Sequence, residues 1–429
     1  MEKVKVALLG FGTVGRGVAQ VLEMNRQVLA NRVGKELELH KIFVRESRKV
    51  EPDKKDDARF VTEIREIIED SEIDIVIEAM GGEEPATEYI KAALRAGKPV
   101  VTANKLAIAT RGAEMIELAQ EIGVPFFYEA SVGGGIPIVR QIRESLNSNE
   151  ILSLMGIVNG TTNYILSKMT NEGMEYGEAL AEAQAKGFAE ADPTSDVGGH
   201  DAVYKLSILS SLAFSGSTDY RQIYREGIEE ISGEDICYAD RFGYVIKLLA
   251  VAKRQGNQIS ARVHPAMIPK AHPMASIQEA YNGIYVVGNV AADIMISGQG
   301  AGALPTASAI VSDVMNIIKS DTTGAIEEKK LKNLSMMPME ENLLCYYVHV
   351  KVEDTYGVLS AISAVFGKNQ VSILAMSQEA AKDGEATLVF ITHLTREGNL
   401  AQAVAEMRGL KMVRKVANVI RIEALADSK

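Results

Sequence analysis

The chain has 429 residues, which is enough for two or three domains. Its 47% hydrophobic and 24% charged content is typical of a globular protein, and no apolar run reaches the length of a membrane span. The net charge of −11 argues against nucleic acid and anionic membranes as partners, because both attract basic surfaces, so we expect no nucleic-acid and no membrane partner. The distant Cys237 and Cys345, and the lack of a signal segment, favour a cytoplasmic protein.

The segment VKVALLGFGTVGRGVAQVLE at 4–23 combines a buried-strand pattern, three spaced glycines and an amphipathic helix. Gly10 permits a tight turn, Gly12 lets the backbone approach a pyrophosphate, and Gly15 lets the helix pack closely on the strand. The free amides at the start of that helix suit phosphate charge. This context favours dinucleotide binding over the alternative, a glycine-rich packing turn.

Further strands are expected at 37–44, 73–78 and 99–103, with helices between them. This alternation predicts a doubly wound, parallel sheet in an α/β domain of the Rossmann type. The strand at 99–103 delivers Asn104 and Lys105 to the carboxyl edge of the sheet, where ligands bind. Lys105 is therefore a candidate to face a cofactor or substrate, although it could simply be a solvated residue that opens the next helix.

The residues after the strand at 37–44 bear on the choice of cofactor. Arg45 comes first, with Arg48 and Lys49 close behind, and an arginine here accommodates the 2′-phosphate of NADP. Glu46 could instead bind a ribose hydroxyl. The sequence thus favours NADP and leaves NAD open.

Two loops follow in the middle of the chain. The loop at 128–139 joins Glu129 to three consecutive glycines, so its oxygens could hold a hard monovalent cation, or it could be an interdomain hinge. The segment at 156–166 places Asn159 at a helix start, where the simplest role is an N-cap. Farther on, Arg262, His264 and Pro265 are expected at a strand-to-loop junction.

The stretch GFAEADPTSDVGGHDAVYKL at 187–206 combines four acidic residues and a lysine with Gly, Pro and Ser, and it runs into an apolar helical pattern. Asp201 and Lys205 are four apart and share one face of that helix, while Glu190 lies on the preceding loop. Spacing alone favours an ordinary surface ion pair at a helix start. Between a dinucleotide turn with Lys105 and a second glycine turn at 298–302, the stretch is instead predicted to be the substrate site.

Changes in residue pattern along the chain indicate how it is divided into domains. The helix after the second glycine turn, at about 303–320, is predicted to return to the first domain, 1–130, and to lie beside the cofactor. Residues 131–302 are expected to form an α+β catalytic and dimerisation domain, and the charged, Met-rich 321–343 a linker. The order βαββαβ over 344–429 predicts a ferredoxin-like unit.

These motifs together resemble the homoserine dehydrogenase family. The resemblance covers residues 1 to about 320 and includes, in order, GFGTVG, TANKLA, EASVGGGIP, NGTTNYIL, GFAEADPTSDVGGHDAVYKL and GQGAGALPTASA. It implies reduction of L-aspartate 4-semialdehyde to L-homoserine with NAD(P)H, on the route to threonine, methionine and isoleucine. The segment VEDTYGVLSAISAVF at 352–366 resembles the start of an ACT domain.

The resemblance implies roles for individual residues. Lys205 would be the proton donor, with Lys105 near the nicotinamide as a second catalytic cation, and Glu190 and Asp201 would hold the substrate ammonium group. Gly187 would lie beside both ligands. The residues expected to bind the cofactor are Gly10, Phe11, Gly12, Thr13, Val14, Gly15, Arg45, Lys105, Gly187 and Gly302. The residues expected to bind sodium are Glu129, Val132, Gly134 and Ile136.

The ACT-like segment implies an amino-acid effector near 354–359, with threonine as the candidate, and a homodimer or homotetramer. A purely structural dimerisation module is the alternative. Two other functions stay open from the residues alone. One is a different NADP-linked reductase of a semialdehyde or imine, which would have the same cofactor turn. The other is a nucleotide- and amino-acid-sensing regulator, built from the dinucleotide domain and the ACT-like C-terminal unit.

Overall fold

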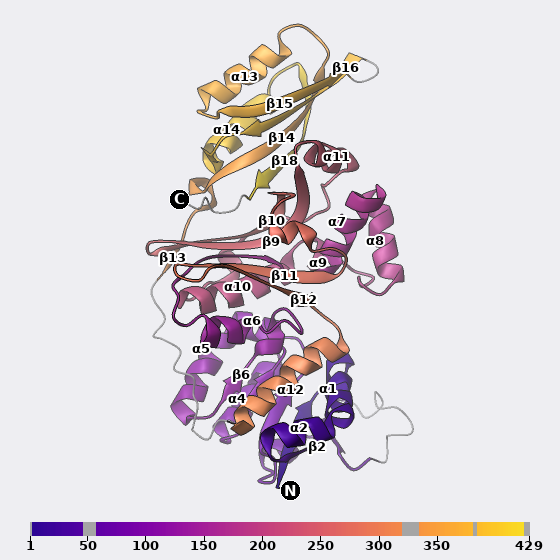
Figure 1. The fold of residues 1–429 in the computed structure, drawn as a ribbon, viewed down its shortest axis with the longest axis vertical. Coiled ribbons are helices and arrows are strands. Elements are labelled where there is room, and N and C mark those ends of the chain that lie inside the picture. Colours follow the sequence, from indigo (N-terminus) through magenta and orange to yellow (C-terminus); the bar gives the residue numbers. More distant parts are fainter. Residues whose placement is uncertain (1, 46–56, 320–333, 381–383, 424–429) are drawn as a thin grey trace.

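The computed structural model describes residues 2–45, 57–319, 334–380 and 384–423. Figure 1 shows an elongated molecule, with the N-terminal unit at one end, the C-terminal unit at the other and a middle unit between them. Within the described ranges, no helix combines the length and the apolar character needed to span a bilayer. Glu46, Arg48 and Lys49 lie outside these ranges.

The N-terminal unit is built on parallel strands. Its described strands are β1 (Lys3–Leu9), β2 (Glu36–Phe43), β3 (Phe60–Val61), β4 (Ile75–Glu78), β5 (Val100–Thr102) and β6 (Phe126–Phe127). They form one sheet in the order β3-β2-β1-β4-β5-β6. Val6 and Leu8 of β1 pack into one helical layer, and Ala7 and Leu9 into the other, because successive side chains point to opposite faces. The predicted doubly wound parallel sheet is confirmed.

Helices cover both faces of this sheet. They are α1 (Thr13–Met24), α2 (Arg26–Val33), α3 (Arg65–Ile68), α4 (Ala86–Arg95), α5 (Lys105–Ile122) and, from much later in the chain, α12 (Ala303–Lys319). Helix α12 packs against α1, with Ile310 and Val18 in the same buried cluster (Figure 1). Gly17 permits this approach, since a Cβ there would lie 2.8 Å from the carbonyl carbon of Ala303.

The middle unit is built on long antiparallel strands. They are β7 (Ile151–Ile157), β9 (Tyr244–Gln255), β10 (Gln258–Pro269), β11 (Tyr281–Gly288) and β12 (Ala292–Gln299). Their order is β12-β11-β7-β9-β10. The described helices of this unit are α6 (Ile138–Arg140), α7 (Gly160–Glu172), α8 (Tyr176–Ala185), α9 (Thr194–Val197), α10 (His200–Phe214) and α11 (Gly233–Arg241). Helix α10 lies against β9 and β10, so the sheet supports the helix that carries Asp201 and Lys205.

The prediction of a strand-to-loop junction at Arg262, His264 and Pro265 is wrong. These residues lie in the middle of β10, which pairs with β9 along its whole length. On its other side, among the residues that the structure describes, β10 pairs in three short stretches, with β8 (Tyr224–Arg225), β13 (Ser335–Met336) and β18 (Val413–Ile422). Pro265 falls between the β8 and β18 pairings, where the ladder is already interrupted, so its missing N–H does not end the strand.

The C-terminal unit has the predicted order of elements. They are β14 (Leu343–Glu353), α13 (Val358–Lys368), β15 (Ile373–Ala380), β16 (Glu385–Thr392), α14 (Glu397–Arg408) and β18, with the short β17 (Thr395–Arg396). The strands are antiparallel in the order β18-β14-β16-β15, and both helices share the core of this sheet. The predicted ferredoxin-like βαββαβ unit is confirmed.

The middle and C-terminal sheets are continuous, which the sequence did not indicate. Strand β18 pairs in parallel with β10, Ala266 opposite Arg421 and Met267 opposite Ile422. Of the predicted linker, residues 320–333 lie outside the described ranges. The following β13 pairs with β10 at Gln258 and Ile259. The C-terminal unit is thus attached to the middle unit by backbone hydrogen bonds as well as by side chains.

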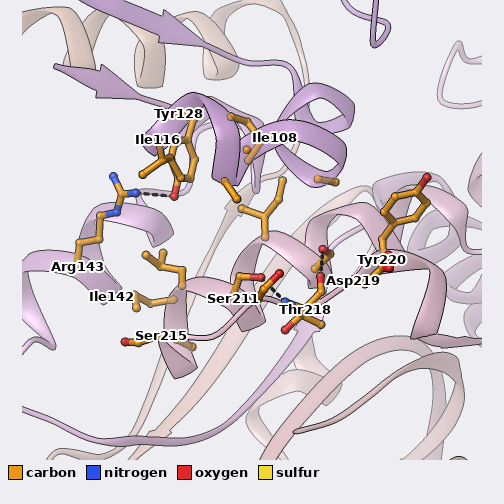
Figure 2. Close-up of a pocket in the computed structure, with 18 of the residues that line it drawn as sticks. Ile108, Ile116, Tyr128, Ile142, Arg143, Ser211, Ser215, Thr218, Asp219 and Tyr220 are labelled. Atoms are coloured by element: carbon orange, nitrogen blue, oxygen red, sulfur yellow. Dashed lines mark hydrogen bonds between the residues drawn. The ribbon is translucent and has the colours of Figure 1, made fainter. Parts of the chain in front are cut away.

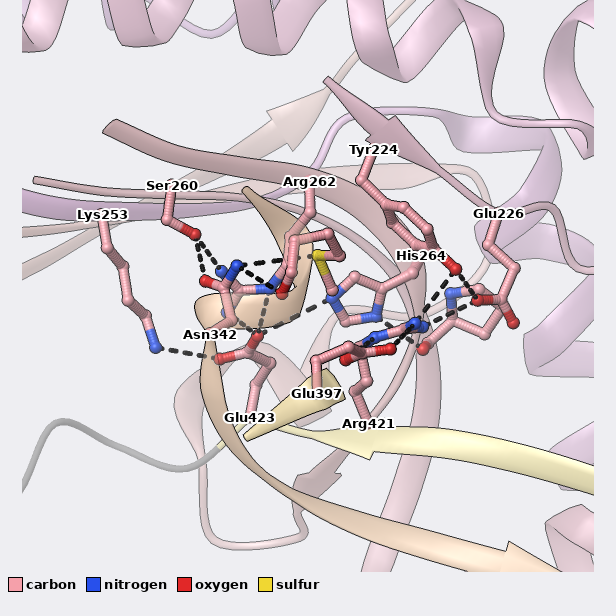
Figure 3. Close-up of polar contacts among 12 residues, drawn as sticks. Tyr224, Glu226, Lys253, Ser260, Arg262, His264, Asn342, Glu397, Arg421 and Glu423 are labelled. Atoms are coloured by element: carbon pink, nitrogen blue, oxygen red, sulfur yellow. Dashed lines mark hydrogen bonds and ion pairs between the residues drawn. The ribbon is translucent and has the colours of Figure 1, made fainter. Parts of the chain in front are cut away.

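Buried charges lie at this junction (Figure 3). The Arg262 guanidinium pairs with Glu423 Oε1, and both side chains are 1% exposed. Lys253 Nζ lies 3.0 Å from Glu423 Oε2, and Arg262 also donates to Ser260 Oγ at 2.9 Å. Burial alone would raise the pKa of Glu423, but Arg262 and Lys253 outweigh burial and hold that pKa well below its usual value. The junction therefore contains a buried, ionised pair.

We expect Arg262→Met to lower the stability of the folded chain by about 3 kcal/mol, because it leaves a buried carboxylate with one cation. The measurement is the midpoint of thermal unfolding. Adding Glu423→Gln to this variant should raise the midpoint again, since the unpaired charge is gone. Arg254→Met is the control, because Arg254 pairs with the half-exposed Glu150. Equal midpoints for the two single variants would contradict the role of the buried pair.

Candidate active site

Lys105, Asp201 and Lys205 meet where the N-terminal and middle units face each other. Lys105 Nζ lies 2.5 Å from Asp201 Oδ1, and Lys205 Nζ lies 2.7 Å from Asp201 Oδ2. Lys205 Nζ also donates to the carbonyl oxygen of Val158 at 2.6 Å. Asp201 and Lys205 are buried, whereas the side chain of Lys105 is 45% exposed. One carboxylate thus joins two ammonium groups, one of which reaches solvent.

The charges of this group are stabilised mutually. Burial alone would raise the pKa of Asp201, but Lys205 and Lys105 outweigh burial and hold that pKa well below its usual value. Burial would lower the pKa of Lys105, yet Asp201, with smaller effects of Asp196 and Glu190, raises it. Asp201 is therefore an anion and Lys105 a cation at neutral pH.

Lys105 owes its place to the end of β4 and the start of α5. Asn104 caps α5 by accepting a hydrogen bond from the backbone N–H of Ala107 at 3.1 Å. Its amide nitrogen donates to the carbonyl oxygen of Gly82 at 2.7 Å. The buried Glu78 accepts hydrogen bonds from Thr102 Oγ1 at 2.5 Å and from the N–H of Met80 at 2.7 Å. These bonds fix the chain at the carboxyl edge of the sheet, as predicted for Lys105.

Asp201 and Lys205 are placed by the start of α10. Gly199 precedes the helix with φ +81°, a conformation that favours glycine, and packs against Val263 of β10. Asp201 lies in the first turn, where the helix dipole favours an anion, and Lys205 follows one turn later. The predicted shared helix face is confirmed, but it is buried in the protein and is no surface ion pair.

Asn159 and Asp196 also belong to this group, and the sequence did not identify them. Asn159 caps α7, as its position suggested, by accepting from the N–H of Thr162 at 2.9 Å. Its amide nitrogen also donates to Asp201 Oδ2 at 2.9 Å and to Asp196 Oδ1 at 2.7 Å. A capping asparagine uses only its side-chain oxygen for the cap, so its NH₂ group still needs an acceptor. That unused donor was the one sign in the sequence that Asn159 could bind a nearby carboxylate.

Glu190 and Gly187 lie on the loop after α8, and both are exposed. The loop is held by Gln184, whose amide donates to the carbonyl oxygen of Glu190 at 3.0 Å. Gly187 has φ +76°, so the chain turns there. Within the described residues, no hydrogen bond or ion pair of the Glu190 carboxylate is seen, although Glu190 helps to raise the pKa of Lys105.

The glycine turn has the form that a dinucleotide phosphate needs. Gly10 has φ +98°, and a Cβ there would lie 2.8 Å from the carbonyl oxygen of Ala79. Gly12 faces open space, and α1 begins after it without a side-chain cap or an acidic residue in its first turn. A Cβ at Gly15 would collide with the Gly10 carbonyl. The amides of Thr13 and Val14 are therefore available to an anion.

A cavity of about 340 Å³ opens beside this turn. Its lining joins the turn to the ends of β2 and β4, and comprises Gly10, Phe11, Gly12, Arg16, Phe43, Val44, Arg45, Ala79 and Met80. Arg45 is exposed at its mouth. Gly302, with φ +117°, lies just before α12, whose first residue contacts Gly17 of α1. The glycine turn, Arg45 and Gly302 thus lie around one end of α1, whereas Lys105 lies at Asp201 and Gly187 on the loop after α8.

The loop with Glu129, Val132, Gly134 and Ile136 forms a separate buried group. The Glu129 carboxylate accepts backbone N–H bonds from Val139 at 2.8 Å and from Arg140 at 2.7 Å. Burial raises the pKa of Glu129, and these bonds act in the opposite direction. The Glu129 N–H donates to Asp313 of α12 at 3.0 Å, so the loop is tied to the helix beside the cofactor turn.

A larger cavity, of about 700 Å³, lies between α5 and α10 (Figure 2). It faces Ile108 and Ile116 of α5, Ser211 of α10 and the segment around Thr218. None of the residues predicted for catalysis or binding lines this cavity. Its size alone therefore does not make it the candidate active site, for which the ion-paired group on the same two helices is the stronger candidate.

Comparisons with known proteins agree with this geometry. Residues 10–129 match a model of the homoserine dehydrogenase NAD-binding domain, 137–315 a model of homoserine dehydrogenase and 346–411 a model of the ACT domain. The homoserine dehydrogenase of Bacillus subtilis is 38% identical over 433 residues, covering 99% of each chain.

Solved structures give the same result over the whole fold. The crystal structure of a homoserine dehydrogenase from Thiobacillus denitrificans aligns with a TM-score of 0.93 at 38% identity, covering 99% of each chain. A hyperthermophilic archaeal homoserine dehydrogenase mutant in complex with NADPH aligns with a TM-score of 0.64 at 27% identity, covering 73% of this chain and 97% of its own. The chain therefore belongs to the homoserine dehydrogenase family of NAD(P)-dependent oxidoreductases and carries a C-terminal ACT regulatory domain.

Proposed function

We propose that the protein interconverts L-aspartate 4-semialdehyde and L-homoserine at the group formed by Lys105, Asp201 and Lys205. The observation that carries this proposal is the single buried carboxylate between two ammonium groups, at the carboxyl edge of a dinucleotide-binding sheet. Reduction of an aldehyde leaves a developing alkoxide that needs a cation and a proton. A nicotinamide cofactor, when bound, supplies the hydride.

Lys205 is the proton donor in this proposal. An ammonium group has three N–H donors, and Lys205 uses two of them, on Asp201 and on the Val158 carbonyl. Among the described residues the third N–H has no acceptor, so it can donate to the carbonyl oxygen of the substrate. Because the two existing bonds fix Nζ, its remaining proton has a defined direction, and it returns to Lys205 when L-homoserine is oxidised.

Lys105 and Asp201 support Lys205 and bind substrate. Lys105 stays charged because Asp201 raises its pKa, so it serves as the second cation near the developing alkoxide. Asp201 fixes both lysines, and it shares the α-ammonium group of the substrate with Glu190. The exposed Glu190 carboxylate is available for this role, and Gly187 lies on the same loop, where a turn without a side chain lets both ligands approach.

Lys205→Ala should lower kcat by about 10²–10⁴-fold, the usual contribution of a general acid. Binding of the reduced cofactor, followed by its fluorescence, should stay unchanged, because Lys205 does not contact the glycine turn. Lys270→Ala serves as a control, since Lys270 forms an exposed ion pair with Asp240. Turnover of the Lys205 variant within a few fold of that of the control would refute the assignment.

We further propose NADP as the preferred cofactor. Its phosphates would lie on the amides after Gly12, and its 2′-phosphate would meet Arg45 at the mouth of the 340 Å³ cavity. The complex of the archaeal relative with NADPH supports this proposal. Phe11, Thr13 and Val14 would line the phosphates, and Gly302 would approach the nicotinamide end.

If this assignment holds, Arg45→Ala should raise the Kd of NADPH about tenfold or more, because it removes a charge-assisted bond, and should leave the Kd of NADH nearly unchanged. Titrations of both reduced cofactors against the wild type measure this difference. Arg59→Ala is the matched control, since Arg59 is already paired with Asp57. An equal loss for NADPH and NADH would count against the role of Arg45.

A sodium ion is proposed at Glu129, Val132, Gly134 and Ile136. The loop is buried and rich in backbone oxygens, the ligands that such an ion prefers, and its carboxylate supplies negative charge. Bound there, the ion would stiffen the loop that is tied to α12 through Asp313.

NaCl should then raise the midpoint of thermal unfolding more than choline chloride does at equal ionic strength, because only the small ion binds the folded loop. Glu129→Gln should reduce this difference between the two salts. The same midpoint in both salts for the wild type would remove the support for a sodium site.

Assembly, regulation and domain roles complete the proposal. We assign 1–130 with about 303–320 to the cofactor, 131–302 to substrate and dimerisation, 321–343 to a linker and 344–429 to regulation. Threonine is the proposed effector, at 354–359, where α13 begins without a side-chain cap and so has free amides for a carboxylate. A homodimer or homotetramer in the cytoplasm is the expected form.

A further inference from the structure

The segment 224–228 contacts the ACT domain on one side and the loop before Asp201 on the other. It begins as β8, which pairs with β10, and its Glu226 N–H donates to the carbonyl oxygen of Val263 at 2.9 Å. The segment therefore rests on the strand that also pairs with β18. Its side chains and backbone extend from there in two directions.

Toward the ACT domain, the contacts converge on the buried Arg421 of β18 (Figure 3). Arg421 Nη1 lies 2.7 Å from Glu226 Oε2, and Nη2 donates to Tyr224 OH at 3.0 Å. The guanidinium stacks on the Tyr224 ring at 4.7 Å and pairs with Glu397 at the start of α14 at 2.5 Å. The segment is thus bound to a strand and a helix of the ACT domain through one arginine.

Toward the active site, the segment contacts the turn between α9 and α10. The Arg225 guanidinium donates to the carbonyl oxygen of Gly198, and the Ile228 N–H donates to the carbonyl oxygen of Val197 at 3.0 Å. A Cβ at Gly227 would lie 2.9 Å from the Cα of Gly198, so the two backbones touch. These contacts hold the residues immediately before α10.

The position of Asp201 depends on that turn. Gly199 has φ +81°, and a Cβ there would meet both Val263 and Arg225 at 3.2–3.4 Å. Asp201 follows two residues later and is fixed on its other side by Lys105 and Lys205. A shift of the Gly198 carbonyl would therefore change the direction of the first turn of α10 and the distance from Asp201 to Lys105.

We propose that Arg225 is a positioning residue for Asp201, and that the segment 224–228 transmits changes in the ACT domain from Arg421 to the active site. The proposal rests on the proposed function of Asp201 in binding substrate. A movement of β18 displaces Glu226 and Tyr224 through their contacts with Arg421. Arg225 and Ile228, on the same segment, then displace the turn at Gly198 and Gly199. A ligand of the ACT domain acts on substrate binding by this route.

The experiment compares the full chain with Arg225→Met, Arg225→Lys and Glu226→Gln. Met keeps the aliphatic stem but cannot donate to Gly198, Lys can donate, and Gln removes only the charge that faces Arg421. Arg221→Met is the control, because Arg221 pairs locally with Asp219. Two readouts apply: hydrogen–deuterium exchange of the peptide 193–203, which needs no catalysis, and the KM and kcat for L-homoserine with and without threonine as the probe.

Arg225→Met should speed exchange in 193–203 and raise the KM for L-homoserine roughly 2–30-fold, with a smaller change in kcat and none in cofactor affinity. Arg225→Lys should restore most of both. Glu226→Gln should speed the same exchange, although the Glu226 carboxylate contacts Arg421 and not the turn at Gly198. It should also weaken any response of KM to threonine. Exchange in β14 and β16 should stay as in the wild type, which shows an intact ACT domain.

Wild-type exchange in both Arg225→Met and Glu226→Gln would overturn the proposal. An effect of Arg225→Met without any effect of Glu226→Gln would retain the positioning role and overturn the route from the ACT domain. A wild-type chain that does not oxidise L-homoserine would instead refute the proposed function, whereas the exchange results would still decide the mechanical link.

Discussion

The carboxylate of Asp201, buried between two ammonium groups and the Asn159 amide, links the N-terminal unit to the middle unit. A buried charge that loses a partner is strongly destabilising, so the places where the two helices begin matter to stability. Helix α5 starts at Lys105 because Asn104 caps it, and Glu78 stabilises the adjoining end of the sheet. Helix α10 starts at His200, directly after Gly199, which is held against β10. The proposed chemistry and one contact between the two units thus involve the same three side chains.

Much of this arrangement could be predicted because its signals are local. The strand, glycine turn and helix at 4–23 follow one another within a few turns of chain, and each step restricts the backbone of the next. The βαββαβ order of the ACT domain is equally readable, because alternation with period two marks its strands and apolar spacing marks its helices. Lys105, Asp201 and Lys205 were identified from their place in such local patterns and from the resemblance to a family.

Contacts between distant parts of the sequence could not be predicted in this way. Arg262 and Glu423 are 161 residues apart. The sequence around Arg262 therefore does not show that its guanidinium will pair with a buried carboxylate. Pro265 indicated a strand end, because the sequence cannot show that its missing N–H falls in a gap between two pairings. Asn159 was recognised as a cap, while its second contact, with Asp201, depends on the packing of α7 against α9, which precedes α10.

The two edges of strand β10 are covered in different ways, and this limits where the chain could be shortened. One side of it is paired throughout, and the other is covered piecewise by β13, β8 and β18, which come from three separate parts of the sequence. An unpaired strand edge is a template onto which a foreign strand can add. A chain that ended at α12 would leave the stretches 258–259 and 266–267 open to such addition. The ACT domain, through β18, and the segment before it, through β13, therefore also cover parts of the edge of the middle sheet.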